Sequence, residues 1–350
     1  MKTEIWKLGN SSDPTKIAQA ADLLKKGRLV VFPTETVYGI GALPEDKTTL
    51  DKIYQVKKRP KEKLFSWHLS SVSELKKLKL AKNPVFEAIA SKFYPAPFTS
   101  LVKDEKGETV GIRIPQHTSA QTLIHRAGGL LLATSANPSG QASSIDAKMV
   151  QGYFDGKIDL ILDGGPTEYR GDSTVIDFTT EPFKIIRPGV YSQIETELRK
   201  LALTVTKKKT ILLVCTGNTC RSPMAQGWLR TELQRRGLDK EFDVFSCGVF
   251  ARRGVAATFE VELLLKNEGI DISYHRSQPL TKEIIDSATR IIVMAEEHRE
   301  ALLELYPGAA ERIKVLGIED PIGKDFQIYK ECYEKIKKTL KENWDWMLGN

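Results

Sequence analysis

A cysteine and an arginine in the second half of the chain stand at a spacing that suits phosphate chemistry. Residues 213–223 read as a buried strand, a tight loop and the first turn of a helix. Backbone N–H groups of such a loop converge and bind an oxyanion, and Arg221 can add a bidentate fork. The same dipoles favour the thiolate of Cys215, and Ser222 can donate a hydrogen bond to it. The pattern predicts a cysteine nucleophile in a phosphate loop that also contains Thr216, Gly217, Asn218, Thr219 and Cys220.

Phosphate transfer through a thiolate also needs a proton donor for the leaving group. Asp320, followed by Pro321, comes after the last predicted strand. Loops at the carboxyl ends of parallel strands converge on one crevice, so we expect this carboxylate near Cys215. The residues alone leave two plainer interpretations open, an Asp-Pro turn and a buried structural cysteine.

Residues 209–347 resemble the low-molecular-weight protein phosphatase family. Besides the loop, the resemblance rests on four short blocks, at residues 246–249, 269–272, 275–277 and 279–281. It implies that Cys215 forms a phosphocysteine, that Arg221 holds the phosphoryl group, and that Asp320 protonates the leaving group and then activates water. Asn218 and Ser222 would shape the loop, and no cofactor is implied.

Comparison with that family narrows the choice of leaving group. Its tyrosine-specific members place aromatic residues after the Asp-Pro pair, whereas Ile322 and Gly323 follow here. Thr219 matches the threonine of the family's protein-arginine phosphatases, which favours phosphoarginine over phosphotyrosine. Cys220 suggests a reversible disulfide with Cys215. A thiol-dependent arsenate reductase is a lower-ranked alternative, because it needs a relay of two more cysteines.

The first half has no glycine-rich phosphate loop, but its polar residues gather at predicted strand ends. Basic and hydroxyl side chains there could bind a triphosphate and a small zwitterion. Each block also has an ordinary structural interpretation, so the residues alone predict only a site for an anionic ligand. The blocks are residues 32–39 (FPTETVYG), 57–60, 65–69, 111–115, 134–137, 172–175 and 187–189.

Together these blocks resemble the YrdC-type threonylcarbamoyl-AMP synthase family, over about residues 10–195. The resemblance implies condensation of L-threonine, bicarbonate and ATP, with Mg²⁺ on the triphosphate, to an adenylate used for t6A modification of tRNA. Its expected partners are tRNA-modification proteins and RNA. Carried over by position, the residues that would contact threonine are Thr36, His68, Arg113, Ser135 and Ser173. Those that would contact ATP are Lys57, Arg59, Lys63, Thr109, Asn137, Ser143 and Arg187.

A second hypothesis for the first half is an RNA- or nucleotide-binding module without synthase activity, joined to a redox-sensing phosphatase. The formal net charge of the chain is +7, and residues 1–200 hold 29 Lys and Arg against 23 Asp and Glu. A positive surplus of this size suits either an anionic small molecule or RNA.

The elements that must position these residues follow two different patterns. In the first half, predicted helices near residues 14–26, 48–57, 72–80 and 119–127 interleave irregularly with many strands, which favours a mixed-sheet α+β domain. After a basic junction at residues 207–209, strands and helices alternate strictly, which predicts an α/β domain with a doubly wound parallel sheet. We place the domains at residues 1–203 and 204–350.

The composition is that of an ordinary soluble protein, with 41% hydrophobic and 28% charged residues. No apolar run approaches the roughly 20 residues of a membrane-spanning helix, and the first residues lack the apolar stretch of a signal peptide. Four cysteines make no disulfide framework. We therefore expect a cytoplasmic protein with no membrane partner.

Overall fold

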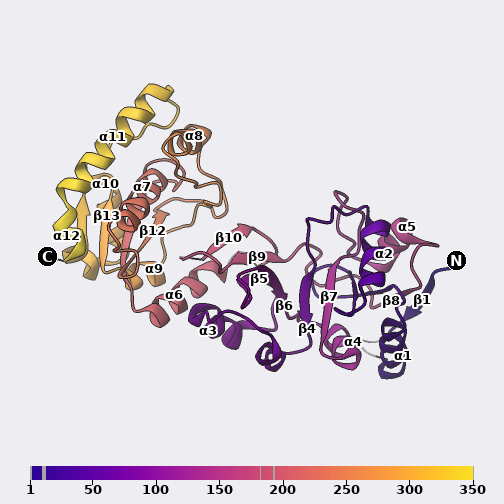
Figure 1. The fold of residues 1–350 in the computed structure, drawn as a ribbon. Coiled ribbons are helices and arrows are strands. Elements are labelled where there is room, and N and C mark those ends of the chain that lie inside the picture. The colour runs from indigo at the N-terminus through magenta and orange to yellow at the C-terminus, as the bar shows by residue number, and fades with distance from the viewer. Residues whose placement is uncertain (1, 10–12, 182, 192–193, 350) are drawn as a thin grey trace. The chain divides into compact units, whose positions relative to one another are not determined.

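The computed structural model describes residues 2–9, 13–181, 183–191 and 194–349. Contacts within the chain separate two compact units, Met1–Gln193 and Ile194–Asn350 (Figure 1). Helix α6 (Glu195–Thr206) falls in the second unit. The division placed between residues 203 and 204 from sequence lies inside that helix, about one helix length after the division by contacts.

The described residues of the first unit form a mixed sheet in the order β1-β8-β2-β3-β7-β4-β6-β5-β9-β10. The sheet contains both parallel pairs, such as β4 with β6, and antiparallel pairs, such as β4 with β7. The predicted α+β mixed-sheet architecture is therefore confirmed. The strands are β1 (Glu4–Lys7), β2 (Val30–Phe32), β3 (Gly39–Ala42), β4 (Ser66–Leu69), β5 (Phe98–Lys103), β6 (Thr109–Arg113), β7 (Leu130–Ser135), β8 (Leu160–Asp163), β9 (Thr174–Asp177) and β10 (Lys184–Arg187).

Helices cover both faces of this sheet because its central strands are apolar on both sides. Val30 and Phe32 pack with α1 and α4, whereas Val31, between them, packs with α2 and α5. Successive side chains of a strand point to opposite faces, so the three residues of β2 contribute to the hydrophobic cores on both sides of the sheet. The helices are α1 (Pro14–Lys25), α2 (Lys47–Lys57), the 3₁₀ helix η1 (Val72–Lys77), α3 (Pro84–Phe93), α4 (Thr118–Ala127) and α5 (Ala147–Phe154).

The second unit has a four-stranded, all-parallel sheet in the order β12-β11-β13-β14. Its strands are β11 (Lys209–Cys215), β12 (Phe242–Gly248), β13 (Arg290–Val293) and β14 (Ile313–Val315). Two separate cores flank the sheet: Leu213 belongs to one, and Leu212 and Val214 to the other. The predicted doubly wound architecture is confirmed.

The helices of the second unit connect these strands and enclose the sheet from both sides. Helices α7, α8 and α11 pack on one face, and α9 and α10 on the other. Their bounds are α7 (Arg221–Arg235), α8 (Phe259–Asn267), α9 (Lys282–Ser287), α10 (Glu296–Leu305), the 3₁₀ helix η3 (Pro307–Arg312), α11 (Phe326–Glu342) and α12 (Trp344–Leu348). None of the described helices is long and apolar enough to cross a bilayer.

Three expectations about individual elements differ from the structure. The predicted helix at residues 72–80 is the shorter 3₁₀ helix η1, which has no buried residue to support an α-helix. The predicted last helix is divided at Asn343, which ends α11 and precedes α12. The prediction also lacked strands β1, β3, β4 and β5 and helices α3 and α5; β3 reads Gly-Ile-Gly-Ala and β4 carries a serine and a histidine, neither of which is a strong strand pattern.

Candidate active sites

The cysteine of the phosphate loop lies at the end of β11, immediately before the loop that leads into α7. Cys215 is 2% exposed. Its Sγ lies 3.0 Å from Ser222 Oγ and accepts a hydrogen bond from the backbone N–H of Asn218 at 3.3 Å. Since both donors approach the sulfur directly, the loop can hold a thiolate and stabilise it again when it departs as a leaving group.

Asn218 holds the loop in shape from a fully buried position. Its φ is +55°, in the left-handed region that asparagine tolerates better than most residues. The side-chain amide donates to Ser222 Oγ and Ser246 Oγ, both at 2.9 Å. Its Oδ1 accepts from the backbone N–H of Gln278 at 3.0 Å, and its backbone carbonyl is 2.7 Å from His275 Nε2. Every polar group of this buried side chain therefore has a partner.

Arg221 is buried at the start of α7 with its guanidinium anchored on three sides. It is 1% exposed and donates to the backbone carbonyl of Ile318 at 3.1 Å and to Thr216 Oγ1 at 2.9 Å. It also forms an ion pair with Asp320, whose side chain is 35% exposed. The structure thus brings together the three residues predicted as catalytic, with Asp320 open to solvent above the loop. The Nε of Arg221 is buried without a protein partner.

His298 supports the loop although no sequence motif singles it out. It is fully buried, and its Nδ1 accepts the backbone N–H of Ala295 at 3.1 Å. Burial and the charge of Arg221 lower its pKa. The neutral ring therefore carries its proton on Nε2, which donates to Thr216 Oγ1 at 2.9 Å. The two residues are 82 positions apart, which explains why sequence reasoning missed the pair.

The remaining cysteines are all free thiols. Cys220 Sγ lies 3.8 Å from each of the hydroxyl oxygens of Thr219, Thr258 and Tyr329, and burial raises its pKa. Burial also raises the pKa of Cys332, to about 12, and that of Cys247 well above its usual range. The disulfide of Cys215 with Cys220 stays a prediction.

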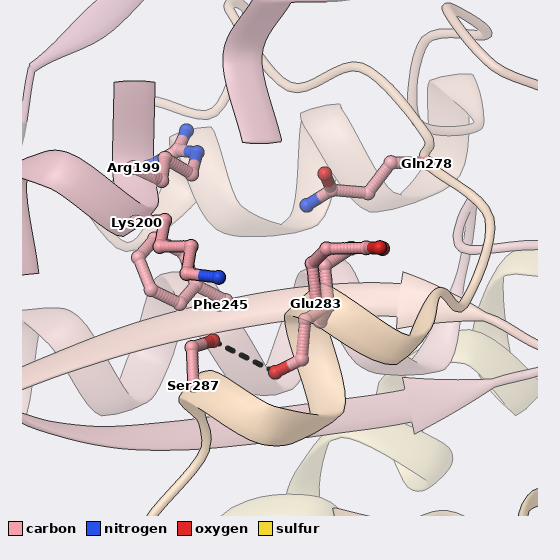
Figure 2. Close-up of a pocket in the computed structure, with 7 residues that line it drawn as sticks. Arg199, Lys200, Phe245, Gln278, Glu283 and Ser287 are labelled. Carbon is pink, nitrogen blue, oxygen red and sulfur yellow. Dashed lines mark hydrogen bonds between the residues drawn. The ribbon is translucent and has the colours of Figure 1, made fainter. Parts of the chain in front are cut away.

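A hollow lies within the second unit, lined by residues of α6, β12 and α9 and by Gln278 (Figure 2). It is partly open to solvent, and its cavity volume of about 10 Å³ is small. The carboxamide of Gln278 points into it, while the backbone N–H of Gln278 binds Asn218. The predicted catalytic residues are not part of its lining, which consists of Arg199, Lys200, Phe245, Gln278, Glu283, Ile284 and Ser287.

In the first unit, a buried ion pair lies at the centre of the predicted threonine site. Arg113 ends β6 and contacts Glu35 Oε1 at 2.5 Å and Thr36 Oγ1 at 3.0 Å. Both charged residues are almost fully buried, at 3% and 1% exposure. Arg113 Nε and Glu35 Oε2 have no partner within the protein. A buried donor and a buried acceptor without partners are costly, unless a ligand or water satisfies them. Glu35 was not among the predicted site residues.

Two more predicted threonine contacts lie next to this ion pair. His68 faces Arg113 across the parallel pair of β4 and β6, and its burial and the charge of Arg113 lower its pKa to about 4. Thr99 faces Arg113 on the other side, and its Oγ1 is 3.1 Å from Ser173 Oγ. His68 is therefore neutral at pH 7. Its Nδ1 donates to the backbone carbonyl of Ser66 at 3.2 Å, which leaves Nε2 as an acceptor for a ligand hydroxyl.

Arg187, one of the predicted ATP contacts, joins this cluster through Ser173. Its Nη2 donates to the backbone carbonyl of Ser173 at 2.8 Å and to its Oγ at 3.1 Å. Ser143, another predicted ATP contact, donates to Asp172 Oδ1 at 2.8 Å, one residue before Ser173. Both polar groups therefore border the Arg113 cluster.

Lys57 and its neighbours form a second group, at the end of β7. Lys57 is 1% exposed, and its Nζ donates to the backbone carbonyls of Ser135 and Asn137. Burial, and to a smaller degree the charge of Arg59, lower its pKa to about 7. Ser135 Oγ donates in turn to Asn137 Oδ1 at 2.6 Å. Lys57 and Asn137, predicted to contact ATP, and Ser135, predicted to contact threonine, are thus brought together by buried contacts within the protein.

Three predicted ATP contacts lie outside both groups. Arg59 donates to the backbone carbonyls of Lys63 and Leu64, each at 2.8 Å, and Lys63 itself is exposed. Thr109 is exposed at the opposite end of β6 from Arg113, where Lys103 Nζ donates to it at 2.9 Å. Four residues of strand span about 13 Å, so Thr109 and Arg113 do not meet.

Among the described residues, no group of three or more His, Cys, Asp or Glu side chains is arranged to hold a metal ion. The donors of the Arg113 cluster are mainly cationic or hydroxyl groups, which suit an anionic ligand. A Mg²⁺ ion fits this chemistry only if it arrives bound to phosphate oxygens.

Comparison with known proteins divides the chain at the same place as the fold. Residues 22–189 match the sequence model of the Sua5/YciO/YrdC family, described as "Telomere recombination", and residues 210–345 that of low molecular weight phosphotyrosine protein phosphatases. The threonylcarbamoyl-AMP synthase of Pyrococcus abyssi is 37% identical over 183 residues, which are 50% of this chain and 54% of that protein. The corresponding protein of Bacillus subtilis is 35% identical over 204 residues, 54% of this chain and 59% of its own length. The chain thus spans little more than half the length of these curated relatives.

The second unit has a relative of nearly its full length. The protein-arginine-phosphatase of Geobacillus stearothermophilus is 37% identical over 139 residues, which are 37% of this chain and 90% of that protein. A solved structure, that of Pyrococcus abyssi Sua5 complexed with L-threonine, has a TM-score of 0.53 and 24% identity, covers 89% of this chain and 99% of its own, and shows likeness of fold alone. The chain therefore belongs to the low-molecular-weight protein phosphatase family through its second unit, and its first unit matches the Sua5/YciO/YrdC sequence model.

Proposed function

We propose that the second unit is a cysteine-dependent protein phosphatase. The carrying observation is the contact of Cys215 Sγ with the Ser222 hydroxyl and the Asn218 amide, beside the ion pair of Arg221 and Asp320. The thiolate attacks phosphorus, and the bond from phosphorus to the leaving atom breaks as the phosphocysteine forms. Arg221 and the loop amides bind the phosphoryl oxygens, on which negative charge is concentrated.

Asp320 performs the proton transfers of both steps in this proposal. Its side chain is 35% exposed, so it can meet a leaving group that enters from solvent. It protonates the departing atom in the first step. In the second step the resulting carboxylate takes a proton from water, which attacks the phosphocysteine and releases inorganic phosphate. The thiolate then departs toward the donors from Ser222 and Asn218.

We infer a preference for phosphoarginine over phosphotyrosine. Thr219 lies on the loop, and Ile322 replaces the aromatic residue that follows the Asp-Pro pair in tyrosine-specific members. The relative named a protein-arginine-phosphatase supports this substrate. The test is kcat/KM of the full chain on two peptides that differ only in phosphoarginine or phosphotyrosine. Higher kcat/KM on phosphotyrosine would refute the preference and leave the phosphatase proposal intact.

We further propose that the first unit is an L-threonylcarbamoyladenylate synthase, with its product used in t6A modification of tRNA. The curated relatives of this unit carry that activity in their names. The carrying observation is the cluster of Arg113, Glu35 and Thr36, flanked by His68 and Ser173.

The two unpartnered buried atoms of this cluster suit the two ends of an amino acid. Arg113 Nε can donate to the carboxylate of threonine, and Glu35 Oε2 can accept from its ammonium group. Neutral His68 is suited to the threonine hydroxyl. Arg187 and Ser143, at the border of the cluster, are placed to contact phosphates of ATP, with which Mg²⁺ would enter.

The synthase proposal is tested by pyrophosphate release from the full chain supplied with ATP, L-threonine and bicarbonate. Release should require all three, and Arg113→Lys should reduce it about 100-fold, because lysine cannot reproduce a fork of two donors. Arg126→Lys is the matched control, since Arg126 is exposed on α4 of the same unit. Release that does not depend on threonine would contradict the proposal.

A further inference from the structure

Four large apolar side chains are exposed around the phosphate loop of the second unit. Phe250 is 78% exposed, Phe259 73%, Ile322 59% and Val255 46%. We call these four residues the apolar rim. Single exposed apolar residues are ordinary on protein surfaces, but a group of them beside a binding site marks an interaction surface.

Backbone hydrogen bonds tie the first side of the rim to the phosphate loop. The N–H of Phe250 donates to the carbonyl of Thr216 at 3.0 Å. At the other end of the same segment, the N–H of Thr258 donates to the carbonyl of Thr219 at 3.0 Å. Residues 250–258 therefore arch beside the loop from its second residue to its fifth, with Phe250 at one end and Phe259 directly after the other.

The second side of the rim follows the proposed acid. The N–H of Ile322 donates to Asp320 Oδ1 at 3.2 Å, and Asp320 is paired with Arg221. Ile322 and the arch thus belong to two segments that are each held directly by residues of the phosphate site. A phosphorylated side chain that reaches Cys215 must leave its own backbone near these segments.

From this arrangement we infer that the rim binds an extended protein segment whose phosphorylated residue is flanked by apolar side chains. The inference rests on the proposed phosphatase function and specifies its substrate class. Cys215 and Arg221 are 2% and 1% exposed, so in a protein substrate the phosphorylated side chain must project from a flexible segment to reach them. Neighbouring apolar side chains of that segment then cover the exposed rings, which removes apolar surface of both partners from water.

Two exposed arginines, Arg252 and Arg253, lie within the same arch and define the competing possibility. Charge complementarity alone would favour acidic flanks. The rim favours apolar flanks, because exposed charge pairs contribute little to affinity, whereas burial of an aromatic ring contributes more. The two alternatives predict opposite rankings of substrates.

The test compares three phosphopeptides that carry the same phosphorylated residue with apolar, neutral polar or acidic flanks. With the full chain, we expect kcat/KM for the apolar peptide to exceed that for the polar peptide at least tenfold. Hydrolysis of p-nitrophenyl phosphate by the same preparation reports the phosphatase chemistry independently of any flank.

Variants identify the surface responsible. Phe250→Ser and Phe259→Ser should each lower kcat/KM for the apolar peptide about tenfold, equivalent to about 1.4 kcal/mol, and less than twofold for the polar peptide. Leu305→Ser is the matched control, because Leu305 is 62% exposed at the far end of α10 in the same unit. An inhibition constant for inorganic phosphate that equals the wild-type value shows that the phosphate loop of a variant is intact.

Equal kcat/KM for the three peptides would overturn the inference while the phosphatase proposal stands. Preference for the acidic peptide would overturn it in favour of Arg252 and Arg253. If p-nitrophenyl phosphate and all three peptides are left unhydrolysed, the phosphatase proposal fails, and the inference fails with it.

Discussion

Asn218 has two structural functions in the phosphate loop: its backbone adopts positive φ, and its side chain forms hydrogen bonds. Two replacements of Asn218 separate these functions. Asn218→Gly removes the side chain but keeps a residue that adopts positive φ freely. Asn218→Ala removes the same hydrogen bonds and adds the strain of a left-handed alanine at φ near +55°. The difference between the variants therefore measures backbone strain, and their common loss measures the side-chain network.

The expected loss of stability follows from the hydrogen bonds that each variant removes. Both variants lose two bonds to serine hydroxyls and leave the buried N–H of Gln278 without an acceptor. An unsatisfied buried donor costs about 1–3 kcal/mol and each of the two lost bonds about 1 kcal/mol, so we expect the glycine variant to be destabilised by about 3–5 kcal/mol. The alanine variant should lose a further ~1–2 kcal/mol. Because Ser222 loses its orientation toward Cys215, kcat should fall about 100-fold in both.

Thermal unfolding of the full chain, combined with phosphatase kinetics, measures these effects. Two units can unfold separately, so the transition of the second unit is identified as the one that inorganic phosphate raises. For a unit of this size 1 kcal/mol shifts the unfolding midpoint by about 2–4 °C, so the glycine variant should melt about 6–20 °C lower. A glycine variant within 1 °C and twofold of the wild type would refute the positioning role of the network. Equal midpoints for glycine and alanine would refute the strain at positive φ.

Three further changes test other parts of the molecule. Asp320→Asn should lower kcat by about 100- to 10,000-fold on phosphopeptides, but much less on p-nitrophenyl phosphate, whose leaving group needs no proton; an equal loss on both would contradict an acid role. Lys57 has a folded pKa of about 7 and an unfolded pKa near 10.5, so the unfolded chain binds the extra proton between these values and stability should rise with pH there, by about 1.4 kcal/mol per pH unit. For Lys57→Met, denaturant unfolding between pH 7 and 9 should show no such rise in stability with pH. An unchanged rise would refute the assignment of this pH dependence to Lys57. Thr219→Ile should depress phosphoarginine turnover more than phosphotyrosine turnover if Thr219 contacts the guanidinium, whereas a larger loss on phosphotyrosine would show that the substitution only narrows the site.

The sequence by itself determined the phosphate loop and the class of both folds. Cys215, Arg221 and Ser222 lie within eight consecutive residues, so a strand, a loop and a helix N-terminus place them together whatever surrounds them. Asp320 was predictable for a related reason, because the ends of parallel strands converge at one edge of a sheet. Alternation of strands and helices distinguishes the parallel sheet of the second unit from the mixed sheet of the first.

Only the tertiary structure decided which distant residues meet. Glu35 pairs with Arg113 across 78 positions, and His298 with Thr216 across 82. Lys57, the last residue of α2, is buried against the backbone carbonyls of Ser135 and Asn137, 78 and 80 positions away. Such contacts depend on which strands pair and in which register, and a one-residue shift would turn every side chain to the other face. Local patterns report the conformation of a segment, whereas burial, partner choice and the charge state of Lys57 and His68 arise from long-range packing.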